Sequence, residues 1–64
     1  MPSPDELFHQ FLKLTGKPIE VGVASLGRRL KGIVVYAMFD SFLLESNGKR
    51  QTIRFDDISY LETF

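Results

Sequence analysis

The basic residues of this chain fall in short clusters, and clustered cations are what binds the phosphate backbone of nucleic acids. Arg28, Arg29 and Lys31 place three cations within four residues, and Lys49-Arg50 adds two beside a predicted turn. Phosphate contacts from such clusters do not depend on base sequence and weaken as salt rises. Alternatively, the same cations form a solvated loop and protect a strand edge. Taken alone, the cluster favours this second interpretation.

Candidates for catalysis or metal binding are few. His9 is the only histidine and cysteine is absent, which excludes the usual zinc sites. Asp56 and Asp57 could act as paired acids in proton transfer, but adjacent aspartates at a strand break are typical of turns. Together with Asp40, they lack the spacing of a calcium loop. The sequence therefore predicts no enzyme activity, metal, cofactor or small-molecule substrate.

Length and composition limit the remaining possibilities. The chain has 64 residues, with eight basic and eight acidic side chains and no net charge. A domain of this size buries only roughly 60% of the surface that its unfolded chain exposes. Without disulfides or a metal, oligomerisation is the remaining means of stabilisation. No apolar run is long enough to span a membrane, and no signal-peptide pattern is present, so a cytoplasmic location is expected.

The first part of the chain predicts a helix over about residues 4–15. Ser3 is a candidate N-cap, Pro4 suits the first helical position and Glu6 completes a capping box. Gly16 is a candidate left-handed stop. An apolar face at helical spacing follows the cap and comprises Leu7, Phe8, Phe11, Leu12 and Leu14.

The rest of the chain predicts five short antiparallel strands over about residues 18–63. Alternating apolar residues are typical of half-buried strands, and Asn47-Gly48 favours a tight hairpin. Gly32 suggests a bulge or sharp bend in the second strand. The predicted strands cover residues 19–24, 29–36, 42–44, 51–55 and 58–63. The fold class is therefore mainly β: one domain over residues 1–64, a small, strongly bent five-stranded antiparallel SH3-like barrel with an N-terminal α-helix.

An apolar stretch after the second strand leaves two interpretations open. Tyr36, Met38 and Phe39 exceed what one half-buried strand needs. Core packing is the favoured interpretation, and exposure at an interface or ring face is the alternative.

Four segments resemble the Sm-like family, in particular its bacterial Hfq branch, across residues 8–60. Residues 44–49, Leu-Glu-Ser-Asn-Gly-Lys, resemble the third-strand and hairpin segment of some Hfq proteins. Residues 27–32, Gly-Arg-Arg-Leu-Lys-Gly, match the Gly-x-x-Leu-x-Gly that opens the second strand. Residues 39–42, Phe-Asp-Ser-Phe, resemble the Phe-Asp-x-Phe of the first motif. Residues 53–61 are similar to the second motif, Ile-Arg-Gly-Asp-Asn-Ile-x-x-Ile.

The chain also departs from the family pattern. The Phe39-Asp40 doublet falls two residues later after Gly32 than the family spacing. Leu44 stands near the place of the Sm asparagine, and Phe55-Asp56 stands where Hfq carries Lys-His.

The resemblance implies a ring that binds single-stranded RNA, with bases stacked on aromatic side chains and held by an arginine. It implies this arginine's role for Arg54, for which an ion pair with Asp56 or Asp57 is the alternative, and base contacts for Asp40 and Phe42. The basic clusters would contact phosphates. The complete set of expected RNA-binding residues is Arg54, Asp40, Phe42, Arg28, Arg29, Lys31, Lys49 and Arg50.

The resemblance further implies a cyclic homo-oligomer of about five to seven subunits, in an RNA-chaperone or RNA-processing role. In such a ring the fourth strand of one subunit pairs with the fifth of the next. A rival hypothesis is a protein-interaction or scaffold ring without RNA, which the zero net charge favours. Apolar residues beyond the capacity of one small core also predict assembly: Ile33, Val35, Leu43, Leu61 and Phe64.

Overall fold

One antiparallel sheet and one helix make up the protein, seen here in a computed structural model that describes residues 4–64. The predicted cap at Ser3 lies outside these residues. The helix is α1 (Pro4–Leu14). The strands are β1 (Pro18–Val23), β2 (Arg28–Ala37), β3 (Ser41–Ser46), β4 (Lys49–Arg54) and β5 (Ile58–Thr63). Two 3-10 turns, η1 (Ala24–Leu26) and η2 (Phe55–Asp57), complete the described chain.

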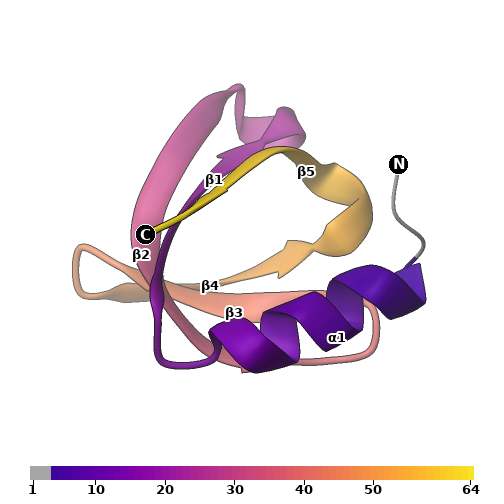
Figure 1. The fold of residues 1–64 in the computed structure, drawn as a ribbon. Helices are drawn as coiled ribbons and strands as arrows, with labels where there is room; N and C mark the ends of the chain where they lie inside the picture. The colour runs from indigo at the N-terminus through magenta and orange to yellow at the C-terminus, as the bar shows by residue number, and fades with distance from the viewer. Residues whose placement is uncertain (1–3) are drawn as a thin grey trace.

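The strands lie in the order β4-β3-β2-β1-β5, so β4 and β5 are the two edges of the sheet. Figure 1 shows the sheet curled on itself, with β4 and β5 on opposite sides of its interior and α1 below them. The mainly β architecture of helix and five antiparallel strands confirms the predicted fold class. The curl stays open between β4 and β5, which do not pair within the chain.

Three aromatic rings join the helix to the sheet. Phe11 of α1 lies 4.3 Å from Phe42 of β3 and 5.2 Å from Phe55 of η2, measured between ring centroids. Aromatic pairs at such distances add to the free energy gained by burying their area. Phe55 was expected within the fourth strand, but it begins η2 and turns its ring inward. The buried core is Phe11, Ile19, Val21, Val23, Val34, Phe42, Leu44, Ile53 and Phe55.

The helix is held to β2 at its end. The Gly16 N–H donates to the Val34 carbonyl oxygen at 2.7 Å, and the Val34 N–H donates to the Lys17 carbonyl oxygen at 3.2 Å. Because both polar groups of Val34 are used in this way, the chain leaves α1 at a fixed place on the sheet.

The bulge of β2 differs from the prediction in position. The register with β3 shifts between Val34 and Tyr36, two residues beyond Gly32, where the bulge was expected. Gly32 has a different role, because a Cβ atom there would collide with the backbone carbonyl of Glu45 on β3. The glycine is needed for close approach of two strands, and the extra residue of the bulge lies further along.

The hairpin between β3 and β4 agrees with the prediction. Asn47 and Gly48 have φ values of 54° and 76°, which a tight two-residue turn requires and which these two residue types tolerate.

Candidate nucleic-acid interface

Arg54 lies at the end of β4 and forms an ion pair with Asp56. Its Nε donates to Asp56 Oδ1 at 3.2 Å and its Nη2 donates to Asp56 Oδ2 at 3.3 Å. The hydrogen bond and charge of Asp56, with the charge of Asp40, raise the pKa of Arg54. In the single chain Arg54 therefore forms the ion pair that was given as the alternative to an RNA contact, and its partner is Asp56. Both side chains are largely exposed, so the pair contributes little to the free energy of unfolding.

A pocket of 210 Å³ lies beside this ion pair, lined by Phe39, Asp40, Arg54, Phe55 and Asp56. Asp40 reaches the pocket from the loop between β2 and β3, and its carbonyl oxygen accepts the Phe55 N–H at 3.0 Å. Ser41, which is buried, donates its hydroxyl to Asp40 Oδ1 at 3.1 Å. The fold thus brings two predicted site residues, Asp40 and Arg54, to one place from separate segments.

The exposed aromatic residue at this pocket is Phe39, beside the buried Phe55, and the expectation for Phe42 is wrong. Phe42 is fully buried in the core, so its ring cannot stack on a base. The Phe39 ring is 69% exposed and lies 6.4 Å from the ring of Phe8 on α1. An exposed aromatic beside a guanidinium is a suitable surface for stacking a nucleobase.

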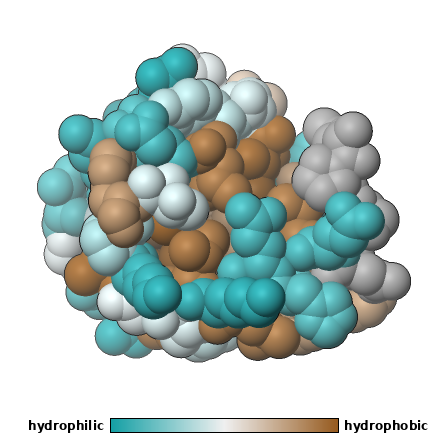
Figure 2. All heavy atoms as spheres, in the orientation of Figure 1, coloured by the Kyte–Doolittle hydropathy of each residue, from teal (hydrophilic) through white to brown (hydrophobic). Residues whose placement is uncertain are grey.

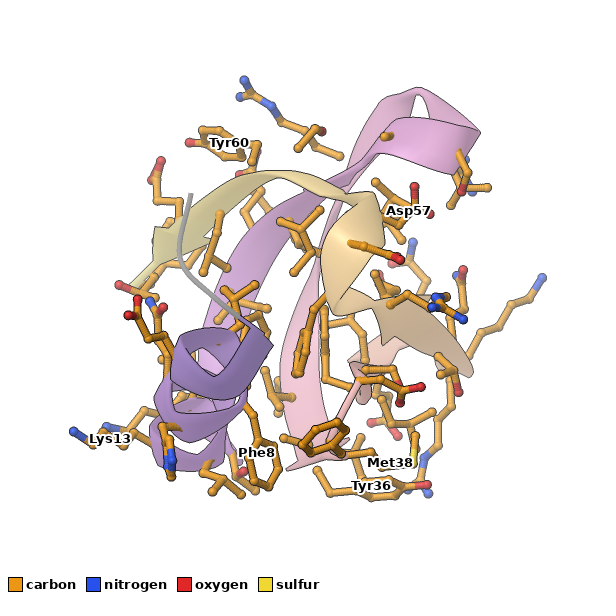
Figure 3. The ribbon with its side chains drawn as sticks, turned by 90° about the vertical axis from the view of Figure 1, so that its right-hand side faces the viewer. Phe8, Lys13, Tyr36, Met38, Asp57 and Tyr60 are labelled. Atoms are coloured by element: carbon orange, nitrogen blue, oxygen red, sulfur yellow. The ribbon has the colours of Figure 1, made fainter. Side chains whose placement is uncertain are left out.

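The apolar stretch around Phe39 is exposed in the single chain, so the favoured core interpretation was wrong. Tyr36 is 47% exposed and Met38 37%. Figure 3 shows Phe8, Tyr36 and Met38 together at one end of the molecule, with Asp57 and Tyr60 toward the other. This end therefore carries an apolar surface next to the pocket.

The predicted basic cluster of β2 is engaged in contacts on the outer face of the sheet. Arg29 and Lys31 lie 3.7 Å and 3.8 Å from the carboxylate of Glu20 on β1. The Arg29 guanidinium also lies 3.8 Å above the centroid of the Tyr60 ring on β5. Sequence spacing could not indicate these contacts, because strand register places the partners opposite each other. The charges of Arg29 and Lys31 are therefore partly neutralised by Glu20.

The basic residues of β4 are divided between its two ends. Lys49 and Arg50 begin the strand and Arg54 ends it. Arg50 forms an ion pair with Glu45 on β3, at 3.0 Å. Among the described residues, Lys49 and Arg28 form no ion pair. The expected RNA-binding residues therefore occupy several parts of the surface, and only Asp40 and Arg54 share the pocket.

Other kinds of site are absent from the part of the chain that the structure describes. Among the side chains that the structure describes, those of residues 6–64, no three histidine, cysteine or acidic groups gather as metal ligands would. His9 is exposed on α1, as the sequence predicted. Across the same residues, α1 is too short and too polar to cross a membrane.

An N-terminal helix and a five-stranded, curled antiparallel sheet with these connections define the Sm-like fold of the Hfq type. The chain is similar to the crystal structure of a protein described as the pleiotropic translational regulator Hfq, with a TM-score of 0.69 and 23% sequence identity. The similarity covers 94% of this chain and 95% of that one. No family model matches the sequence, and no curated protein matches it.

Proposed function

We propose that this protein assembles into a cyclic homo-oligomer in the cytoplasm and binds single-stranded RNA, in an RNA-chaperone or RNA-processing role. The fold it shares with a translational regulator supports this proposal. The observation that carries it is the exposed Phe39 ring beside Arg54, over one pocket.

The proposed mode of binding uses the two side chains differently. A base stacks on Phe39, which contributes roughly 1–3 kcal/mol in single-strand binding proteins. Arg54 then leaves its exposed ion pair with Asp56 and donates hydrogen bonds to the base in the plane of its guanidinium. Two carboxylates, Asp40 and Asp56, line the same pocket and disfavour a phosphate there. The pocket therefore receives the base, and the backbone runs outside it.

Assembly is supported by the two free edges of the sheet. β4 and β5 each leave one side without a strand partner, and a second copy can pair with them. The surplus apolar residues support it too, since Ile33 and Phe64 are 46% and 63% exposed in the single chain. Figure 2 shows apolar side chains gathered in the middle of one face, bordered by hydrophilic ones. A ring of weak sites gains affinity by multivalency.

The second candidate function is a protein-interaction or scaffold ring on the same fold. Ion pairing within the chain favours it, because four of the eight basic residues, Arg29, Lys31, Arg50 and Arg54, already face carboxylates. Such a surface attracts RNA less strongly than its number of cations suggests.

Filter binding of oligo-U and oligo-A at two salt concentrations separates the two functions. We expect the wild type to bind at least one of them, more weakly at the higher salt. Phe39→Ala should lower the affinity about tenfold, the loss of one stacked base. Leu12→Ala is the control, since it removes an exposed apolar side chain of α1 that lies neither in this pocket nor on an edge strand of the sheet. Absence of binding to either oligonucleotide at low salt would favour the protein-interaction ring.

A further inference from the structure

The two free edges of the sheet carry opposite charges. The exposed charges of β4 are all basic, namely Lys49, Arg50 and Arg54. The only charged residue of β5 is Glu62, which is exposed. One copy of the chain therefore offers a basic edge and an edge whose sole charge is negative, which suits head-to-tail association.

Glu62 is an acid of this face for which the described residues provide no cation. It lies directly opposite Glu20 of β1, and like charges at opposed positions in a sheet destabilise it. Glu20 is compensated by Arg29 and Lys31 on its other side. Glu62 accepts a hydrogen bond from the Tyr60 hydroxyl, and no basic side chain among residues 4–64 forms an ion pair with it.

Full-length overlap of the two edges, together with the direction of their side chains, defines a register between two copies. β4 and β5 each have six residues, so antiparallel pairing over their full length places Arg50 opposite Glu62 and Gln51 opposite Leu61. Gln51 and Leu61 are both half-buried, and Arg50 and Glu62 are both exposed. A shift of one residue would oppose inward and outward side chains, which sheet pairing avoids.

We propose that Glu62 of one copy forms an ion pair with Arg50 of the next, and that this pair fixes the register of assembly. The inference rests on the proposed assembly and names the contact that governs it. Arg50 already lies 3.0 Å from Glu45 on the outer face, so in the assembly it stands between two carboxylates. The added cation also relieves the repulsion between Glu62 and Glu20.

Charge reversal tests the pair. Glu62→Arg and Arg50→Glu each place like charges across the edge, so we expect each variant to dissociate at a protein concentration at least about tenfold higher than the wild type. Lys13→Glu is the control for Arg50→Glu, since it reverses an exposed cation on α1 and should leave assembly unchanged. Masses come from native mass spectrometry and sedimentation, and circular dichroism checks that every variant is folded.

Mixing the two variants gives the decisive measurement. An equimolar mixture of Glu62→Arg and Arg50→Glu restores opposite charges at every contact between unlike variants, so heteromeric assemblies in which the two variants alternate should form where each variant alone stays dissociated. Single variants that assemble like the wild type, or a mixture that fails to associate, would overturn the inference and leave the proposed function standing. A wild-type chain that is a folded monomer at micromolar concentration would overturn both.

Discussion

Asp57 of η2 accepts two hydrogen bonds from Ser25 of η1, a residue 32 positions earlier in the chain. The Ser25 N–H donates to Asp57 Oδ1 at 3.0 Å, and the Ser25 hydroxyl donates to Asp57 Oδ2 at 2.5 Å. The carboxylate therefore joins the turn between β1 and β2 to the turn between β4 and β5. Its neighbour Asp56 forms an ion pair with Arg54 instead, so the two adjacent acids have different partners.

Removing this link should destabilise the fold while leaving the pocket intact. Asp57→Ala leaves the Ser25 donors without their acceptor, and we expect a loss of about 1–2 kcal/mol in the free energy of unfolding, measured in urea. Asp56→Ala is the control, with a change of about 0.5 kcal/mol or less, because its ion pair is exposed. A double-mutant cycle with Ser25→Ala should show coupling. Strict additivity would mean that the bonds contribute nothing.

Gly32→Val should be the most damaging single change on β2. The new side chain would collide with the Glu45 carbonyl and approach Leu44 Cδ1, so the two strands would have to separate. We expect a loss of about 2–4 kcal/mol, seen as a large fall in melting temperature. Gly48→Ala is the comparison, since no atom lies near its added Cβ and only the positive φ opposes it, at about 1 kcal/mol. An unchanged melting temperature in Gly32→Val would contradict the close approach.

The sequence predicted those parts of the fold that depend on local signals. Periodicity marked the helix and strands, and Asn47-Gly48 marked the hairpin, because a turn of this kind needs only two adjacent residues. Local signals could not predict that Phe39, and not Phe42, is the exposed aromatic at the pocket beside Arg54. The register shift between Val34 and Tyr36 alters which side chains turn outward, and the following loop leaves Phe39 exposed while Phe42 enters the core.

The ion pairs of Arg29 and Lys31 also could not be predicted from residues close to them in the sequence. Arg29 and Lys31 are adjacent to Glu20 only because β1 and β2 pair in one particular register. Counting cations along the sequence therefore overestimated the charge available to a phosphate.

Arg54→Lys should separate an RNA contact from a structural one. Lysine keeps the charge but cannot stack on a base or donate two hydrogen bonds in one plane. We expect single-strand affinity to fall several-fold while assembly and melting temperature are retained, with oligo-U and oligo-A both tested by filter binding. Equal affinity of the wild type and Arg54→Lys would remove Arg54 from the site.

Alkaline pH should weaken the fold through Tyr60. Its hydroxyl donates to the Glu62 carboxylate, and this bond, with partial burial and the charge of Glu62, raises the pKa of Tyr60 above the ordinary value of 10.0. Since the folded state holds the phenolic proton more tightly than the unfolded one, the stabilisation is complete below pH 10 and is lost as pH rises through the raised pKa.

Ultraviolet difference absorbance in a Tyr36→Phe background follows the titration of Tyr60 alone, at a protein concentration low enough to keep copies apart. Glu62→Gln should lower the pKa of Tyr60 toward its ordinary value, because the amide is a weaker acceptor and carries no charge. A titration midpoint that is the same with and without Glu62 would contradict this assignment.

The aromatic contact of Phe11 with Phe42 and Phe55 has a consequence for the order in which the chain folds. The three rings are far apart in sequence, so bringing them together closes long loops and costs chain entropy. We therefore expect this contact to form after strands that are adjacent in sequence have paired. Isolated helices of about a dozen residues are marginal in water, which leaves α1 dependent on this docking. We therefore expect helix content to appear together with the rigid core in refolding, after the hairpins of sequence-adjacent strands have formed.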